Sequence, residues 1–384
     1  MTRLAAIDIG NDSVKAIFGE VADGNRVTPL PNVIAEASEN RGVVSLESNV
    51  YEGIHCRVTS AALSRSGIYA VGNLATRFPK NEEPEPGSSK ATSDQAVILL
   101  LTSLALDAAQ HDHFPRKGNI VEAKYALSTG LPLKEVKNMG AKATFRSRLM
   151  DKVHEVEFLQ TPQLGGTVVR IELESMDVYS EGQAAMMHLV TDDEGRINNE
   201  ELLQKSILIN DIGGLSTDSA VIERGEPDNM NSDGLNSGVG EYLDAIIQQV
   251  YERYHHRIRS RRNLVRDVLL ATNERKNHIL VDGKLTSIKD IVDEVLTECA
   301  SAQHAHLRRM FQKVSDLELV YQIGGGSALI RPYLTNINEN SGHTYPLRWQ
   351  DSADESIWMI VESYWKMLAL SRKAEGAAAE GVRR

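Results

Sequence analysis

The chain has 384 residues, of which 41% are hydrophobic and 25% charged, so it holds enough apolar residues for two cores of ordinary domain size. Its net charge of −11 argues against broad nucleic-acid binding, because proteins that bind phosphate backbones supply cations. The sequence holds neither a run of about 18 apolar residues nor the basic-then-apolar start of a signal peptide, and we therefore expect a cytoplasmic protein without direct membrane contact.

The N-terminal stretch, residues 5–18, predicts a β-hairpin, because two apolar runs flank the triplet Asp8-Ile9-Gly10 and a polar turn. Extended segments are expected next at 27–35, 43–57 and 68–72, as a small subdomain inserted at about 30–95, with a surface loop at 81–89. The candidate site residues of this first hairpin are Asp8, Gly10, Asn11, Asp12, Ser13 and Lys15.

A helix is predicted at 93–110 from its apolar periodicity, followed by a strand at 123–132. The alternating pattern of 143–174 predicts two or three extended segments, and 176–179 another strand. Glu181 then opens a predicted helix at 182–189 that joins the two halves of the chain. A carboxylate at that place can orient the water that attacks a phosphate, or can be a helix-terminal charge that the dipole stabilises.

A second hairpin is predicted at 207–222, where two apolar runs flank Asp211-Ile212-Gly213-Gly214. Glycine has no side chain to hold a ligand off, so the backbone N–H groups of such a turn can bind a phosphate. Alone, this stretch is equally an ordinary hairpin. The similar hairpin 203 residues earlier favours phosphate binding at both places and two related halves. The candidate residues here are Asp211, Gly213, Gly214, Leu215, Ser216, Thr217 and Asp218.

The second half continues with small residues at 236–240 before an amphipathic helix, where Gly238 and Glu241 are candidates for contact with ribose or phosphate at a helix start. A helix is predicted at 288–314 and a strand at 317–323. The glycines after that strand let a flat ring approach the backbone, and the candidates are Gly324, Gly325, Gly326 and Ser327. A last helix ends near 370, and order is expected to end from Arg372 on.

Six arginines lie between Arg253 and Arg266, on a helix predicted to continue from Tyr242. This basic stretch can be a solvated helix face, a contact for an acidic neighbouring subunit or, least favoured, a DNA contact. The histidine pairs at 111 and 113 and at 304 and 306 are not expected to bind metal, and the two cysteines, Cys56 and Cys299, are expected to be free thiols.

Paired Asp-x-Gly hairpins half a chain apart, with Glu181-Gly182-Gln183 between them and Gly324-Gly325-Gly326 after them, resemble the actin, sugar-kinase and heat-shock-chaperone superfamily. Within it the chain looks most like the plasmid-segregating bacterial actins of the ParM and Alp group. The resemblance implies an α/β, actin-like (ribonuclease H-like) duplicated fold, with two domains around a nucleotide cleft and a mixed sheet flanked by helices in each.

The same resemblance implies an ATPase that polymerises with ATP, with GTP possible, and that links through a DNA-binding adaptor to plasmid DNA. Asp8 and Asp211 are expected to bind Mg²⁺ through water, since this ion keeps its hydration shell. Glu181, Asp211 and Asp8 are the implied catalytic residues, and Arg275 and Lys276 fall where relatives place groups over adenosine. The expected domains are 1–182, 183–340 with a small subdomain at 250–300, and 341–384 returning to the first domain.

Other functions fit the same motifs. A small-molecule kinase would share both hairpins but would need a carboxylate that positions an acceptor. A chaperone would be expected to continue into a substrate domain. A membrane-attached scaffold would need an amphipathic terminal helix, which neither end of the sequence offers.

Overall fold

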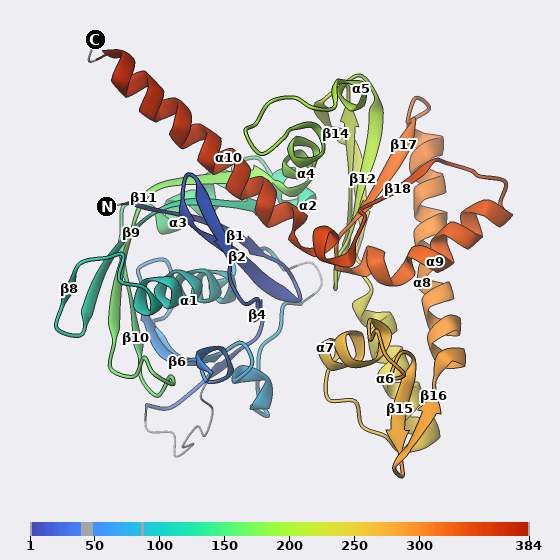
Figure 1. Cartoon of the computed structure of the whole chain (residues 1–384), viewed down its shortest axis with the longest axis horizontal. Coiled ribbons are helices and arrows are strands. Elements are labelled where there is room, and N and C mark those ends of the chain that lie inside the picture. The colour runs from blue at the N-terminus through green and yellow to red at the C-terminus, as the bar shows by residue number, and fades with distance from the viewer. Residues whose placement is uncertain (1, 40–48, 86–87, 383–384) are drawn as a thin grey trace. The chain divides into compact units, whose positions relative to one another are not determined.

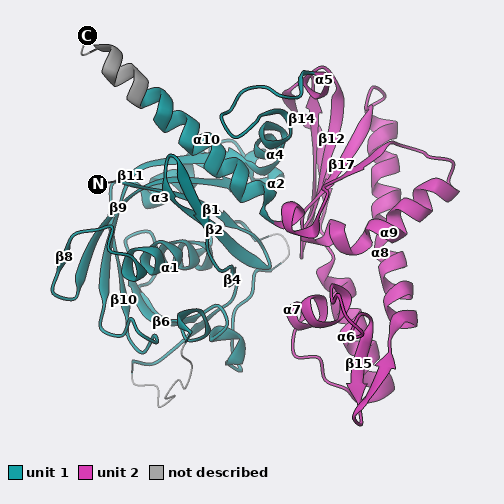
Figure 2. Cartoon of the chain, viewed as in Figure 1, with its two compact units in different colours: residues 1–200, 358–384 teal, residues 201–357 magenta. Residues whose placement is uncertain are grey.

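The computed structural model describes residues 2–39, 49–85 and 88–382, with side chains described as far as residue 375. The chain divides into two compact units, residues 1–200 with 358–384 and residues 201–357 (Figure 2). Each unit is built on its own β-sheet with its own apolar core. In the described part of the chain, no helix is long and apolar enough to cross a membrane.

The sheet of unit 1 holds eleven strands, and its central order is β3-β2-β1-β9-β11. β1 pairs antiparallel with β2 and parallel with β9, and β9 pairs parallel with β11. These strands are β1 (Arg3–Ile9), β2 (Ser13–Glu20), β3 (Asp23–Arg26), β9 (Ile120–Leu131) and β11 (Val168–Ser180). The predicted first hairpin is therefore present, with Asp8 opposite Lys15.

Beyond β11 this same sheet continues through β10 and then through three strands from the region 30–95, in the order β10-β6-β7-β5. They are β10 (Val153–Phe158), β6 (His55–Thr59), β7 (Gly67–Val71) and β5 (Ile34–Glu36), with the short strands β4 (Leu30–Pro31) on β2 and β8 (Arg116–Lys117) on β9. The turns η1 (Val50–Glu52) and η2 (Ala75–Arg77) connect them. Part of the predicted segment 43–57 lies outside the described residues.

Helix α1 (Asp94–Gln110) covers the sheet of unit 1 (Figure 1), and its residues 96–109 are buried. The Ser93 hydroxyl accepts from the N–H of Ala96 and so caps its first turn. The prediction of extended structure from residue 143 is wrong at its start, because α3 (Ala141–Leu149) is a helix that buries Phe145 and Leu149, four residues apart. Shorter helices are α2 (Leu133–Val136) and α4 (Glu181–Val190).

Unit 2 repeats the strand plan of unit 1. Its sheet order is β14-β13-β12-β17-β18, with β12 antiparallel to β13 and parallel to β17. These strands are β14 (Glu226–Leu235), β13 (Thr217–Glu223), β12 (Ser206–Ile212), β17 (Leu319–Ile323) and β18 (Leu347–Trp349). Three antiparallel strands followed by two parallel ones occur in both units, so the predicted duplicated actin-like fold is confirmed.

The prediction of a helix that continues from Tyr242 through the basic stretch is wrong beyond Tyr254, where α6 (Gly240–Tyr254) ends. Helix α6 ends at Tyr254, because His255 takes a left-handed conformation at φ 51° and its N–H donates to the carbonyl of Tyr251. The chain then re-enters a helix only at α7 (Arg261–Leu264) and the π turn η3 (Val265–Leu269). The other elements are α5 (Glu200–Leu203), α6 (Gly240–Tyr254), β15 (His278–Val281), β16 (Lys284–Ser287), α8 (Lys289–Lys313) and α9 (Gly325–Asn340).

The last helix, α10 (Ala353–Val382), packs on unit 1 through its middle third. The ring of Tyr364 stacks on Tyr179 at 6.3 Å between centroids, and the Lys366 ammonium donates to the Thr191 carbonyl at 2.8 Å. The structure carries the helix beyond Arg372, where we expected order to end, because the alanines and glutamates there favour helix.

Candidate functional site

The first hairpin places a carboxylate and an ammonium opposite each other. Asp8 and Lys15 are cross-strand partners at the ends of β1 and β2, with Lys15 Nζ 3.6 Å from Asp8 Oδ2. Both side chains are nearly buried, at 11% exposure for Asp8 and 14% for Lys15. The negative charge of the Asp8 carboxylate therefore has a positive partner within the same hairpin, the Lys15 ammonium.

Two amides that the sequence did not single out support this turn. Asn32 Nδ2 donates to the Gly10 carbonyl at 2.8 Å, and the Asn32 backbone N–H donates to the Asp12 carbonyl at 3.0 Å. Gln95, in the first turn of α1, donates to Asn32 Oδ1 at 2.8 Å. Two segments distant in sequence therefore support the turn through hydrogen bonds, and no local sequence pattern could have indicated these contacts.

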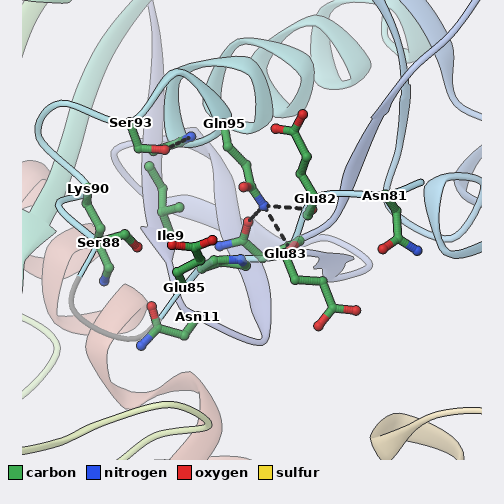
Figure 3. A pocket seen from close by; sticks show the side chains of 13 residues that line it. Ile9, Asn11, Asn81, Glu82, Glu83, Glu85, Ser88, Lys90, Ser93 and Gln95 are labelled. Carbon is green, nitrogen blue, oxygen red and sulfur yellow. Dashed lines mark hydrogen bonds between the residues drawn. The ribbon is translucent and has the colours of Figure 1, made fainter. Parts of the chain in front are cut away.

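A cavity of about 470 Å³ in unit 1 opens beside the first turn (Figure 3). Asn11, Asn32 and Gln95 line it together with Lys90. Its other charged lining residues are Glu82, Glu83 and Glu85. Lys90 is the one cationic side chain among these lining residues, and the three glutamates leave the lining acidic.

Glu181 lies at the first position of α4, as the sequence predicts, and is buried. Its Oε1 accepts from Lys90 Nζ at 2.6 Å, and both side chains are at most 13% exposed. Glu135, from α2, binds the loop that carries Lys90: its carboxylate accepts from the backbone N–H of Lys90 at 2.6 Å and from the Ser89 hydroxyl at 2.7 Å. The sequence indicated Glu181 but missed both Lys90 and Glu135.

The second hairpin has the same backbone plan but a different charge. In β12 and β13, Asp211 stands opposite Asp218 and Ile212 opposite Thr217. Gly213, Gly214, Leu215 and Ser216 form the turn, which the Gly213 N–H closes by donating to the Ser216 carbonyl at 3.0 Å. Two carboxylates directly opposite each other repel, in contrast to the Asp8 and Lys15 pair of the first hairpin.

Two glycine-containing segments pack directly on the second turn. The N–H groups of Val239 and Gly240 donate to the carbonyls of Gly213 and Gly214, at 3.0 and 2.7 Å, and a side chain at Gly238 would collide with the Gly213 carbonyl. Gly324 has φ +83°, and a side chain there would collide with the carboxylate of Asp211. The structure therefore brings the candidates near 213, 238 and 324 together.

Several other candidates use their polar groups inside unit 2. Thr217 and Ser327 are buried: the Thr217 hydroxyl donates to the Ser237 carbonyl at 3.0 Å, and the Ser327 hydroxyl donates to the Gly324 carbonyl at 2.7 Å. Glu241 accepts from the Ser237 hydroxyl. Gly325 and Gly326 begin α9.

Arg275 and Lys276 lie on exposed loop positions before β15. The Lys276 N–H donates to the Asn273 carbonyl at 3.0 Å, and the Arg275 carbonyl accepts from the His278 N–H at 2.9 Å. These bonds stay within the loop. A role of either side chain over adenosine remains a prediction.

Behind the second turn lies a buried polar network that the sequence missed. Gln303 Nε2 donates to the Thr217 hydroxyl at 2.8 Å, and Asn210 Oδ1 accepts from the Ser219 hydroxyl at 2.6 Å. The ring of His306 lies 2.8 Å from the same Ser219 hydroxyl. Burial, with a smaller contribution from Arg309, lowers the pKa of His306 to about 4, so this ring is neutral at pH 7.

The donors present fit a hydrated Mg²⁺ rather than a fully protein-bound metal. Among the residues that the structure describes, no three His, Cys, Asp or Glu side chains cluster as a metal site. Asp8, Asp211 and Asp218 are single carboxylates at turns that can accept from metal-bound waters, which is how Mg²⁺ commonly meets proteins that also hold a phosphate.

Comparison with known proteins gives two family models that follow each other along the chain. The N-terminal domain of actin-like proteins matches residues 6–183, and the Alp7A C-terminal domain matches residues 206–345. No curated protein sequence matches the chain.

Solved structures of low sequence identity share the fold. ParM of Bacillus thuringiensis with ATP is 23% identical over 97% of this chain and 99% of that chain, with a TM-score of 0.75. The same protein with ADP gives 0.74 over the same shares at the same identity, and Ta0583, an archaeal actin homolog, is 17% identical over 96% of this chain and 99% of that chain, with a TM-score of 0.68. With both domain models matched in order over most of its length, the chain belongs to the family of actin-like proteins, with a C-terminal domain of the Alp7A-like type.

Proposed function

We propose that this protein is an actin-like ATPase that assembles into filaments with ATP and hydrolyses it to drive segregation of plasmid DNA. The observation that carries the proposal is the duplicated phosphate turn, one copy at Asp8–Lys15 in β1–β2 and one at Asp211–Asp218 in β12–β13, with Glu181 at the start of α4 between them. Bacillus thuringiensis ParM, which has the same fold, has been solved with ATP and with ADP, and this supports ATP as the nucleotide, with GTP possible.

In this proposal the two turns bind the phosphates through backbone N–H groups, and Lys15 adds a point charge for the β- and γ-phosphates. Bound Mg²⁺, held through water by Asp8 and Asp211, would neutralise phosphate charge. Glu181 orients the attacking water. The proposed nucleotide-binding residues are Gly10, Asn11, Asp12, Ser13, Lys15, Gly213, Gly214, Leu215, Ser216, Thr217, Asp218, Gly238, Glu241, Arg275, Lys276, Gly324, Gly325, Gly326 and Ser327.

The proposed partners are other copies of this chain in the filament and a DNA-binding adaptor on the plasmid. The acidic net charge of −11 supports an adaptor rather than direct DNA binding. The basic stretch supports this too, because three of its arginines already pair with acidic side chains: Arg253 with Asp290, Arg261 with Asp244 and Arg266 with Asp267.

Light scattering with simultaneous phosphate detection tests the proposal. The protein with ATP and Mg²⁺ should scatter light strongly within minutes, release phosphate without any added acceptor, and scatter weakly with Mg²⁺ alone. Phosphate transfer that requires an added sugar, with no rise in scattering, would replace the filament ATPase by a small-molecule kinase of the same fold.

A further inference from the structure

The loop before α1 carries a lysine that the candidate nucleotide machinery does not account for. Lys90 Nζ lies 2.6 Å from Glu181 Oε1, across 91 residues of sequence. The side chains of the two residues are 13% and 10% exposed. A buried carboxylate is costly unless it is paired, so this ammonium sets the charge and the direction of Glu181.

The position of Lys90 is itself fixed by a second carboxylate. Glu135 accepts from the Ser89 hydroxyl at 2.7 Å and from the backbone N–H groups of Lys90 and Ala91 at 2.6 and 3.0 Å. Glu135 is 7% exposed and lies in α2 (Leu133–Val136), the helix that follows β9. These hydrogen bonds fix the loop, and with it the backbone of Lys90, relative to the sheet that carries the first turn.

The same lysine lines the cavity beside the first turn, which it shares with Asn11 (Figure 3). Asn32 also lines this cavity, and its Nδ2 donates to the Gly10 carbonyl of the first turn. Within unit 1, Lys90 thus lies both on the cavity beside the first turn and in hydrogen-bond contact with Glu181.

We propose that Lys90 is a positioning residue for the hydrolytic step, which fixes the orientation of the Glu181 carboxylate, and that Glu135 positions Lys90. This inference rests on the proposed ATPase function. Lys90 acts through Glu181 and not on nucleotide binding. Removing its charge therefore slows hydrolysis of bound ATP, while the affinity for ATP stays.

The test is steady-state ATP hydrolysis by the full chain with Mg²⁺, for wild type, Lys90→Met, Lys90→Arg, Glu181→Gln and the double variant. Lys90→Met should lower kcat by about 10- to 100-fold, because a misplaced group near the reacting atoms loses that much. KM for ATP should stay within about twofold. Lys90→Arg, which keeps the charge, should recover most of kcat.

The double variant separates positioning from a general structural effect. If Lys90 acts through Glu181, adding Lys90→Met to Glu181→Gln should cost no more than about twofold beyond Glu181→Gln alone. Glu135→Gln should give a smaller fall in kcat with the same unchanged KM. Lys124→Met is the matched control, because Lys124 also forms an ion pair, with Glu172, but on an exposed face of the sheet.

Three outcomes overturn the inference. Full kcat in Lys90→Met, a rise in KM without a fall in kcat, or additive losses in the double variant would each remove Lys90 from this role. Thermal unfolding of each variant shows whether it is folded at the assay temperature, and Lys90→Arg decides the case if Lys90→Met is not. A wild type without ATPase activity would overturn both the inference and the proposed function, whereas an active wild type with an inactive Glu181→Gln and an active Lys90→Met overturns the inference alone.

Discussion

The two candidate phosphate-binding hairpins, β1–β2 and β12–β13, share one backbone plan but differ in the charge of the residue opposite the aspartate. In β1–β2 the register position opposite the aspartate holds Lys15, whereas in β12–β13 it holds Asp218. The first pair attracts and the second repels. The aspartate of the first hairpin therefore faces a positive charge across the strands, whereas the aspartate of the second faces a negative one.

The support behind the turns differs as well. Asn32 and Gln95 hold the first turn from loops and a helix start at the edge of a cavity. Gln303, Asn210 and Ser219 hold the second from a fully enclosed network. Two halves with the same strand order therefore differ in what surrounds their turns, and under the proposed function Lys15 of the first hairpin would contact phosphate while Asp211 of the second would hold the hydrated metal.

The largest effect should come from the second hairpin. Asp211→Asn should lower kcat for ATP hydrolysis by about 100-fold or more, because it removes a charge that the proposed Mg²⁺ site needs. Asp8→Asn should also reduce activity, but less, since Lys15 remains beside it. Steady-state phosphate release at saturating Mg²⁺ measures both. Equal activity of Asp211→Asn and wild type would exclude Asp211 from the site.

Next in size is the loss of the lysine that distinguishes the first hairpin. Lys15→Ala should weaken ATP binding by about 10- to 100-fold, which corresponds to one charge-assisted hydrogen bond of about 1.5–3 kcal/mol. Titration with a fluorescent ATP analogue measures the affinity, and Lys124→Ala, on an exposed strand, is the control. An affinity unchanged in Lys15→Ala would show that this side chain does not reach the phosphates.

The enclosed network predicts a pH dependence. The pKa of His306 is about 4 in the folded protein and near 6.5 in an unfolded chain, so as the pH falls the unfolded chain takes up the proton first. The stability contribution of neutral His306 is complete above pH 6.5 and is lost as the pH falls towards 4. Between pH 6.5 and 5 the loss should be about 2 kcal/mol. Urea unfolding at pH 7 and pH 5 should show a smaller loss in His306→Gln than in wild type, and equal losses would contradict the assignment.

The smallest effect concerns repulsion across the second hairpin. Asp218→Asn should stabilise the metal-free protein by about 0.2–1 kcal/mol, because it removes one of two opposed carboxylates. Thermal unfolding in EDTA measures this change. A lower melting temperature in Asp218→Asn would mean that its carboxylate already has a stabilising partner within the protein.

Local sequence signals were sufficient for the elements that a strong local pattern dictates. Both hairpins, α1 with its Ser93 cap and the glycine turn into α9 lie where residue order alone predicts them. Two predictions failed for a physical reason, an extended segment at the position of α3 and a helix through the basic stretch. α3 buries only two apolar side chains, so its sequence alternates like a strand, and the basic run keeps helical composition across His255, where the backbone turns left-handed.

The contacts around the candidate site were not predictable in the same way. Lys90 meets Glu181, and Gln303 meets Thr217, across 91 and 86 residues of sequence, and such pairs form only when the sheet brings distant segments together. Asn32, which binds the Gly10 carbonyl, looks like an ordinary loop residue in the sequence. The sequence therefore indicated two turns as candidates for phosphate binding, and the structure added the hydrogen bonds that support each turn.

The most direct test of the central claim, that this fold couples ATP hydrolysis to filament turnover, is a sedimentation time course of wild type and Glu181→Ala with ATP and Mg²⁺. Glu181 is expected to orient water rather than bind nucleotide, so the variant should pellet as readily as wild type but release phosphate about 100-fold more slowly. Its filaments should then persist long after wild-type filaments have disassembled. Disassembly of both proteins at the same rate, or a wild type that never pellets with ATP, would contradict the account.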